Sequence, residues 1–229
     1  MRNRISKILK LSVILFSIIG LLCNFISATA DGYSHWSKRL LYFTTLSNVW
    51  IAAALALILM LPYLKTWNDS PRVKNLLYVL RYVFIVSITL TGFIFCFVLA
   101  PGAANDNYNA WTFGSIFVHV LVPIASIADF FVDPERITVK RSYVFVSLIP
   151  PALYLAFASI LGVFGVDFGR GDPFPYFFMN YSSPAGFFGM SEVMPYRIGS
   201  FYWIIFLLGV ILAVAASYKR FYNGKNKKP

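Results

Sequence analysis

Residues 77–100 read LYVLRYVFIVSITLTGFIFCFVLA, an apolar run in which Arg81 is the one charged residue. A helix that crosses the hydrocarbon core of a bilayer needs about 20 such residues, because each residue adds about 1.5 Å of rise. The run is continuous, whereas a strand of an outer-membrane barrel alternates apolar and polar residues. The stretch therefore predicts a membrane-spanning α-helix.

The rest of the chain has the same character as this stretch. Of its 229 residues, 59% are hydrophobic and only 13% are charged, whereas about one quarter of the residues of an ordinary soluble domain are charged. Further apolar windows of spanning length occupy residues 8–28, 40–61, 112–131, 142–165 and 198–218. We therefore expect an all-α integral membrane protein, with one domain of six transmembrane helices at residues 1–229.

The distribution of basic residues predicts the orientation of these helices. Of the 20 Lys and Arg residues, all but Lys38, Arg39, Arg170 and Arg197 fall on flanks that share one side of the membrane. These flanks carry Arg2, Arg4, Lys7, Lys10, Lys65, Arg72, Lys74, Arg81, Arg136, Lys140, Arg141, Lys219, Arg220, Lys225, Lys227 and Lys228. Because cytoplasmic flanks normally carry the Lys and Arg excess, both termini should be cytoplasmic. This topology explains the net charge of +11, and we expect no nucleic-acid partner.

The first 30 residues allow two interpretations. A basic segment, an apolar run and small residues at Ala28 and Ala30 together resemble a secretory signal peptide, whose cleavage would leave five helices. The apolar run is longer than the 7–15 residues or so of a signal peptide, which favours a retained helix. Both interpretations place the C-terminus in the cytoplasm.

The longest predicted external loop spans residues 166–197 and is rich in Pro, Gly and aromatic residues. This composition does not support a long helix, but it suits a turn-rich segment whose rings rest at the level of the lipid headgroups. The loop could serve as a lid over a site in the membrane, or its rings could be an interfacial belt and nothing more.

A group of polar residues opens the second spanning window, where residues 42–48 read YFTTLSN. Thr44 lies about four residues inside this window, and His119 lies about seven residues inside the window 112–131. Both windows run inward from the external face, so the two side chains should lie at a similar depth, roughly 6–11 Å below the outer boundary. Thr44, Ser47 and Asn48 share one helix face and form a polar stripe.

These residue types permit nucleophilic catalysis. A threonine hydroxyl is a poor nucleophile until a base removes its proton, and a neutral imidazole is the usual base. Asn48 could then orient a carbonyl or donate to an oxyanion. The alternative is structural: Thr and Ser in spanning helices commonly bond their own backbone or link helices, and a single His is often a packing residue.

The remaining polar and sulfur-containing residues favour structural roles. Asp129, near the cytoplasmic end of its helix, could pair with Arg136 or Arg81, or relay protons. His35 falls in an external loop, where we expect it to be solvated. Cys23 and Cys96 lie within apolar windows and should be packing residues. With only two histidines and two separated cysteines, we expect no metal site and no cofactor.

Three segments together resemble a known family. YFTTLSN at 42–48, HVLVPIASIADFF at 119–131 and DPFPYFFMN at 172–180 are similar, in order and spacing, to segments of the bacterial family described as predicted six-transmembrane-region proteins. That family is distantly similar to the androgen-induced and androgen-dependent membrane proteins, which hydrolyse fatty acid esters of hydroxy fatty acids. The resemblance implies a threonine nucleophile and a histidine, carried here by Thr44 and His119, and a location in the bacterial inner membrane.

The chain departs from the family pattern at two places. Asn180 stands where the family usually has Asp, and Asp172-Pro173-Phe174 replaces the usual first Pro-Tyr pair. We therefore expect Asn180 to support the site with an amide in place of the family's carboxylate. The nucleophile could also be one residue further along, at Thr45.

The function expected from sequence is therefore an intramembrane hydrolase of lipid esters, with membrane lipids or lipid esters as its ligands. Two other classes remain open. A small-solute transporter would show broken helices, paired intramembrane charges or an inverted repeat. A non-catalytic membrane scaffold would use the polar cluster only to hold helices together.

Overall fold

The computed structural model describes residues 1–103, 109–135, 137–169 and 171–224. Within these ranges the protein is all α, and its helices include six segments that are long and apolar enough to cross a membrane. The expected fold class is therefore confirmed. Arg136, Arg170, Lys225, Lys227 and Lys228 lie outside the described residues.

Several of the spans consist of more than one helical element. The spanning segments are α1 (Arg2–Ser27), α2 (Phe43–Met60) with the 3₁₀ turn η2 (Leu61–Tyr63), α4 (Pro71–Ile94) with the π-helical turn η3 (Phe95–Leu99), α6 (Phe113–Ile116) with the π-helical turn η4 (Phe117–Leu121) and α7 (Val122–Val132), α8 (Arg141–Val146) with α9 (Ile149–Val163), and α10 (Ser200–Gly224). Short elements outside the spans are η1 (Trp36–Leu41), α3 (Lys65–Asn68), α5 (Ala100–Ala103) and η5 (Phe177–Met179).

The helices differ from the predicted windows mainly at their ends. α1, α4 and α10 each extend past the predicted window at the basic end, because Lys and Arg are good helix formers and the windows measure only the apolar part. The window 40–61 begins too early, since its first residues belong to η1. Tyr42 has an extended backbone, with φ −93° and ψ 140°, and α2 begins at the next residue.

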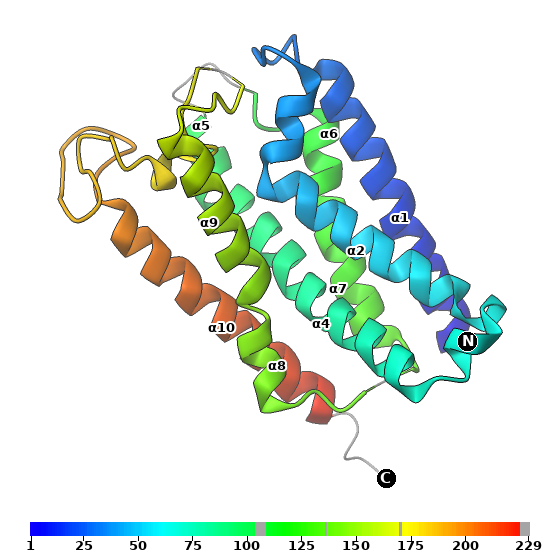
Figure 1. Cartoon of the computed structure of the whole chain (residues 1–229). Helices are drawn as coiled ribbons and strands as arrows, with labels where there is room; N and C mark the ends of the chain where they lie inside the picture. Colours follow the sequence, from blue (N-terminus) through cyan, green and yellow to red (C-terminus); the bar gives the residue numbers. More distant parts are fainter. Residues whose placement is uncertain (104–108, 136, 170, 225–229) are drawn as a thin grey trace.

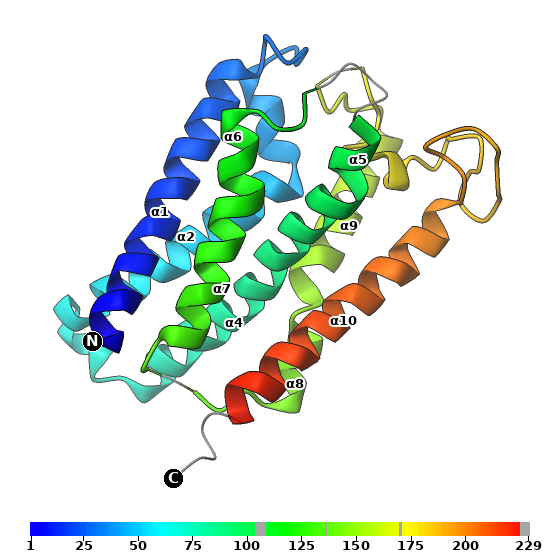
Figure 2. The same ribbon diagram turned by 180° about the vertical axis from the view of Figure 1, so that it is seen from behind.

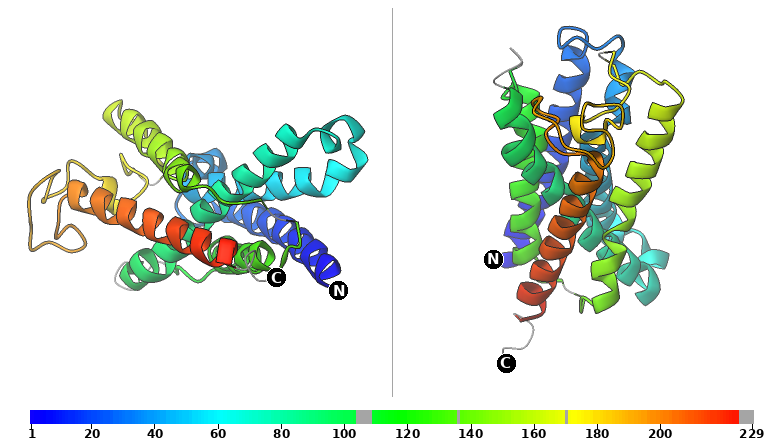
Figure 3. Two further views of the ribbon diagram at one scale, coloured as in Figure 1. Left: turned by 90° about the horizontal axis from the view of Figure 1, so that it is seen from below. Right: turned by 90° about the vertical axis from the view of Figure 1, so that its left-hand side faces the viewer.

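α4 is the central helix of the bundle. α1, α2, α4 and α7 pack against one another, while α10 and α9 contact α4 from its other side (Figures 1 and 2). Two apolar clusters reflect this division: Ile51, Leu77 and Val122 belong to the first, whereas Tyr82 and Ile211 belong to the second. Seen from below, α9 and α10 project away from the side occupied by α1 (Figure 3).

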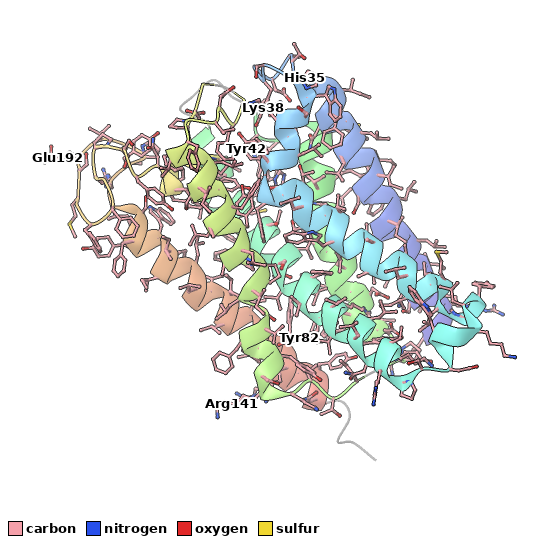
Figure 4. All side chains as sticks on the ribbon, viewed as in Figure 1. His35, Lys38, Tyr42, Tyr82, Arg141 and Glu192 are labelled. Carbon is pink, nitrogen blue, oxygen red and sulfur yellow. The ribbon has the colours of Figure 1, made fainter. Side chains whose placement is uncertain are left out.

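The two ends of the bundle match the predicted topology. The N-terminus and the last described turn of α10 lie at the same end (Figure 1), where Arg141 is also found (Figure 4). His35 and Lys38 lie at the opposite end, as does the segment between α9 and α10 (Figure 4). That segment contains the short turn η5 and an isolated bridge between Met190 and Ile198. Its described residues form no long helix, as its Pro- and Gly-rich composition led us to expect.

A buried cluster of charges joins α1, α4 and α7 near the basic end; we call Lys10, Arg81, Asp129 and Asp133 the charge quartet. Lys10 Nζ lies 2.9 Å from Asp129 Oδ1 and 2.7 Å from Asp133 Oδ2. Arg81 bridges the same two carboxylates, each at 2.6 Å. Ser6 Oγ donates to Asp129 Oδ1 at 2.7 Å. The predicted pairing of Asp129 with Arg81 is confirmed, and Arg136 lies outside the described residues.

α1 is fully part of the packed bundle. Its buried face carries Ser6, Lys10, Val13, Ser17, Gly20 and Asn24. A side chain at Gly20 would come within 2.7 Å of atoms of Phe117 and Val118, so this glycine allows α1 to approach the π-helical turn η4 closely. The packing of α1 therefore supports the part of the structure that carries His119.

Candidate functional site

The structure brings Thr44 and His119 into contact. Thr44 lies in the first turn of α2, and His119 lies in η4; the two elements pack together. The distance between Thr44 Oγ1 and His119 Nε2 is 3.3 Å. Both side chains are partly buried. The equal depth expected from the sequence thus corresponds to a direct side-chain contact between residues 75 positions apart.

The second ring nitrogen of His119 determines the direction of this hydrogen bond. His119 Nδ1 lies 2.9 Å from the backbone oxygen of Ser115. A carbonyl oxygen can only accept, so Nδ1 carries the proton in the neutral ring and Nε2 presents its lone pair. The Thr44 hydroxyl therefore donates to Nε2. This is the arrangement in which the imidazole can accept a proton from Thr44.

Two wide helical turns shape this region. In η4 the N–H of Val122 donates to the carbonyl of Phe117, five residues back, and in η3 the N–H of Ala100 donates to that of Phe95 in the same way. A proline follows each turn, Pro123 and Pro101, and it has no N–H to continue the ordinary ladder. Such π-helical turns are frequent at functional sites.

The two wide turns lie against each other at His119. The ring of Phe95 stacks on the His119 imidazole, with centroids 3.9 Å apart and planes 9° from parallel. A Cβ at Gly92 would lie 2.9 Å from the backbone oxygen of His119, so only glycine permits this approach of α4 to η4. Phe95 is 4% exposed, and it therefore limits the orientations open to the imidazole.

Asn48 and Ser47 hold the start of α2 in place. Asn48 Nδ2 donates to the backbone oxygens of Thr44 and Val118, at 2.8 and 3.2 Å. Ser47 Oγ lies 3.1 Å from the Thr44 backbone oxygen and 2.8 Å from Thr91 Oγ1. Because both amide hydrogens of Asn48 are bound to backbone carbonyls, Asn48 orients the backbone at Thr44 and does not offer a donor to an oxyanion.

Thr45 and Asn180 occupy different surroundings. Thr45 Oγ1 donates to the backbone oxygen of Arg39 at 2.7 Å, so its hydroxyl points away from His119. Asn180 Oδ1 accepts from the backbone N–H of Ser182 at 3.1 Å and does not line the cavity described below. Of the two threonines left open by the sequence, Thr44 is the one beside the histidine.

An apolar cavity of about 230 Å³ adjoins Thr44. Helices α2, α4, α9 and α10, the turn η3 and the segment around η5 all contribute to its walls. The lining residues are Phe43, Thr44, Leu90, Thr91, Ile94, Leu99, Pro151, Ala152, Tyr154, Leu155, Tyr176, Phe178, Met179, Ile204, Leu207, Leu208 and Ile211. Ile204 and Ile211 lie about two helical turns apart, so the cavity follows α10 for about 10 Å.

Two tyrosines stand where the cavity meets Thr44. The Tyr154 hydroxyl donates to the backbone oxygen of Leu41 at 3.0 Å. The Tyr176 hydroxyl interacts with both the side chain and the backbone of Thr44. Tyr176 also packs face to face on Phe178, with ring centroids 5.1 Å apart. Burial raises the pKa of Tyr176 to about 12, although its hydrogen bonds with Thr44 act in the opposite direction.

The sequence did not identify Phe95, Tyr154 or Tyr176 as site residues. Pro101 and Pro123 are the signals that could have indicated the wide turns, because each removes a backbone donor directly after the residue that closes the turn, Ala100 or Val122. Tyr176 belongs to the aromatic loop of residues 166–197, and nothing in its spacing relates it to Thr44. Among the described residues, no three His, Cys, Asp or Glu side chains gather as metal ligands would.

His35 and the two cysteines lie apart from this site. His35 forms a local hydrogen bond with Ser37 Oγ at 2.8 Å, and Cys23 and Cys96 are free thiols. Comparisons with protein-family models, with curated proteins and with solved structures gave no match. What the chain's own residues establish is a multi-pass membrane protein with six candidate spans and a Thr–His pair beside an apolar cavity.

Proposed function

We propose that the protein is an intramembrane hydrolase of lipid esters, with Thr44 as nucleophile and His119 as general base. One observation carries the proposal: Thr44 Oγ1 lies 3.3 Å from a His119 Nε2 whose partner nitrogen is bound by a carbonyl, next to a cavity lined mainly by apolar side chains. A hydroxyl, an oriented base and an apolar acyl pocket are the requirements for acyl transfer from an ester.

The reaction proceeds in two acyl transfers. Thr44 Oγ gives its proton to His119 Nε2 and bonds to the ester carbonyl carbon, whose π pair moves to oxygen. The tetrahedral intermediate expels the alcohol, which takes the proton from His119, and an acyl-threonine remains. Water then attacks with His119 as base, the fatty acid leaves, and the Thr44 hydroxyl is regenerated.

The position of the cavity supports a lipid substrate. Ala152, on α9, lines the cavity and is itself exposed, so we expect an acyl chain to enter sideways from the bilayer between α9 and α10. The resemblance to the six-transmembrane-region family supports the same chemistry and a bacterial inner membrane. That family's distant relatives act on fatty acid esters of hydroxy fatty acids, and we propose this ester class as the substrate.

The test is labelling of the purified protein in detergent with a fluorophosphonate, which phosphonylates an activated hydroxyl and releases fluoride. Wild type is compared with Thr44→Ala, His119→Ala and Thr45→Ala, and hydrolysis of 4-nitrophenyl octanoate is followed in parallel. We expect Thr44→Ala and His119→Ala to lose labelling and hydrolysis by on the order of 10⁴-fold. Thr45→Ala is the matched control, since its hydroxyl bonds the Arg39 carbonyl.

Thermal unfolding in the same detergent shows whether each variant is folded. Labelling that persists in a folded Thr44→Ala variant would overturn the assignment of the nucleophile. Equal labelling in all four proteins, or no labelling in any of them, would rule out the proposed hydrolase. Such a result would favour a scaffold in which the Thr–His pair only links helices.

A further inference from the structure

We propose that the Tyr176 hydroxyl and the backbone N–H of Thr44 together bind the oxyanion of the tetrahedral intermediate, which makes Tyr176 a further catalytic residue. The inference rests on the proposed function, because it concerns the same ester carbonyl. It assigns a chemical role to the segment between α9 and α10, which otherwise only covers the cavity.

The polar groups of the cavity wall leave Tyr176 as the available side-chain donor. Thr91 Oγ1 is bonded to Ser47 Oγ at 2.8 Å, and the Tyr154 hydroxyl is bonded to the Leu41 carbonyl at 3.0 Å. Asn48, behind the wall, gives its amide hydrogens to two backbone carbonyls. The Tyr176 hydroxyl also has polar partners, but one of them is Thr44, the proposed nucleophile, so this donor already lies at the reacting group.

The start of α2 supplies the backbone donor. The first ladder bond at this end runs from the N–H of Leu46 to the carbonyl of Tyr42, at 3.2 Å, and no side chain caps the helix. The N–H groups of the first turn therefore have no intrahelical acceptor. The interaction of Thr44 with Tyr176 includes the Thr44 backbone and stabilises the phenolate form, as a donating N–H does.

These donors lie on the side of Thr44 where a negative charge develops. When Thr44 Oγ bonds to the carbonyl carbon, the carbonyl oxygen becomes an alkoxide close to the nucleophile's own N–H. The positive end of the α2 dipole favours a negative charge there. Tyr176 and Thr44 line the same cavity, and the Tyr176 ring packs against the rings of Tyr42, two residues before Thr44, and of Tyr154. This placement puts the Tyr176 hydroxyl within reach of the same oxygen.

Tyr176 remains a donor over the working pH range. Burial raises the pKa of its hydroxyl to about 12, so the neutral form, which carries the proton, predominates at all pH values below that. The hydroxyl keeps its proton throughout the reaction: it donates a hydrogen bond to the oxyanion and releases it when the carbonyl re-forms. Proton transfer stays with His119.

The experiment compares Tyr176→Phe with wild type for hydrolysis of 4-nitrophenyl octanoate and for the rate of fluorophosphonate labelling. The Phe ring keeps the stacking on Phe178, and only the hydroxyl is lost. We expect kcat and the labelling rate to fall about 10²-fold, as when one oxyanion donor is removed, with KM changed by no more than about twofold. Tyr181→Phe is the matched control, since that hydroxyl bonds Ser159 Oγ at 2.6 Å.

Replacement of Tyr176 by 3,5-difluorotyrosine gives a second readout, because fluorine makes the phenol more acidic without changing its shape. We expect kcat to decline at alkaline pH in this variant at a pH where wild type is still active. A folded Tyr176→Phe variant with kcat within about threefold of wild type, in a protein that Thr44→Ala inactivates, would overturn the role of Tyr176 alone. Retained activity in Thr44→Ala would overturn both this inference and the proposed function.

Discussion

Two clusters of polar side chains lie inside this bundle, one near each end, and they differ in what surrounds them. The charge quartet at the basic end is closed: its four members are at most 4% exposed and bind one another. The Thr44–His119 pair at the opposite end adjoins a cavity of about 230 Å³. The first cluster is saturated by protein atoms, whereas the second has space beside it for another molecule.

An adjacent cavity distinguishes a reactive polar cluster from a structural one better than burial does. Polar groups at membrane depth are costly and often mark function, and by that criterion alone the quartet is the stronger candidate. Its two cations and two carboxylates, however, satisfy each other at 2.6 to 2.9 Å. A reactive group needs a hydrogen-bond partner that prepares it and an adjacent volume for the substrate, and Thr44 has both.

The largest effect on stability should come from unbalancing the quartet. Asp129→Asn removes the carboxylate that binds both Lys10 and Arg81 and leaves a buried excess of positive charge among the described partners. Breaking a buried ion pair in this way costs about 3–5 kcal/mol. Unfolding followed in detergent by thermal or denaturant titration measures it. The double variant Arg81→Met/Asp129→Asn restores the balance of buried charge and should recover part of the lost stability.

A free energy of unfolding for Asp129→Asn within about 1 kcal/mol of the wild-type value would contradict this structural role. The quartet would then be no more important for stability than a surface pair, and its burial would need a functional explanation. Thr44→Val is the companion variant at the other end. We expect it to lose hydrolysis while its stability falls by no more than about 1 kcal/mol, the net value of one hydrogen bond.

A smaller effect is expected when the cavity is filled. Leu208→Trp, on α10, places a large ring in the volume that we assign to the acyl chain. It should lower kcat/KM for 4-nitrophenyl decanoate about tenfold relative to the acetate, since misfit of a chain in an apolar pocket costs about 1–3 kcal/mol. Ile205→Trp is the matched control, because Ile205 is 54% exposed on the same helix. An equal fall in kcat/KM for the two esters would show that the cavity does not hold the acyl chain.

The smallest effect concerns the threonine next to the nucleophile. Thr45→Ala removes the hydrogen bond to the Arg39 carbonyl and should lower the free energy of unfolding by about 1 kcal/mol. Hydrolysis should remain within about twofold of wild type, because the hydroxyl does not face the cavity. Kinetic assays and unfolding on the same preparation check both values. A variant that stays folded and loses hydrolysis would move the nucleophile to Thr45.

Hydropathy predicted the six spans because a bilayer requires long, continuous apolar segments. It did not predict which helices are neighbours, since lipid and protein are equally suitable surroundings for Leu or Ile. Lys10 shows the same limit: its sequence context is a basic N-terminal flank, and its role as counterion to Asp129 and Asp133 depends on the packing of α1 on α7.

The depth of Thr44 and His119 in the membrane could be predicted from the sequence, but the contact between their side chains could not. A rise of about 1.5 Å per residue placed Thr44 and His119 at one level, and their pairing then required α2 to lie against η4. Phe95 and Tyr176 could not be predicted, because the first depends on two wide turns meeting and the second on the path of an irregular loop. The sequence left Asn48 either to orient a carbonyl or to donate to an oxyanion, and in the structure its amide donates to two backbone carbonyls.

The charge quartet also bears on how the chain is assembled in the membrane during synthesis. Lys10 and Arg81 emerge from the ribosome on the first and third spans, well before Asp129 and Asp133, which follow on the fourth. Until that span arrives, two positive charges near the membrane lack the partners that neutralise them. We therefore expect α1, α2 and α4 to remain loosely associated until α7 is inserted, and α9 and α10, which carry no member of the quartet, to dock afterwards and enclose the cavity.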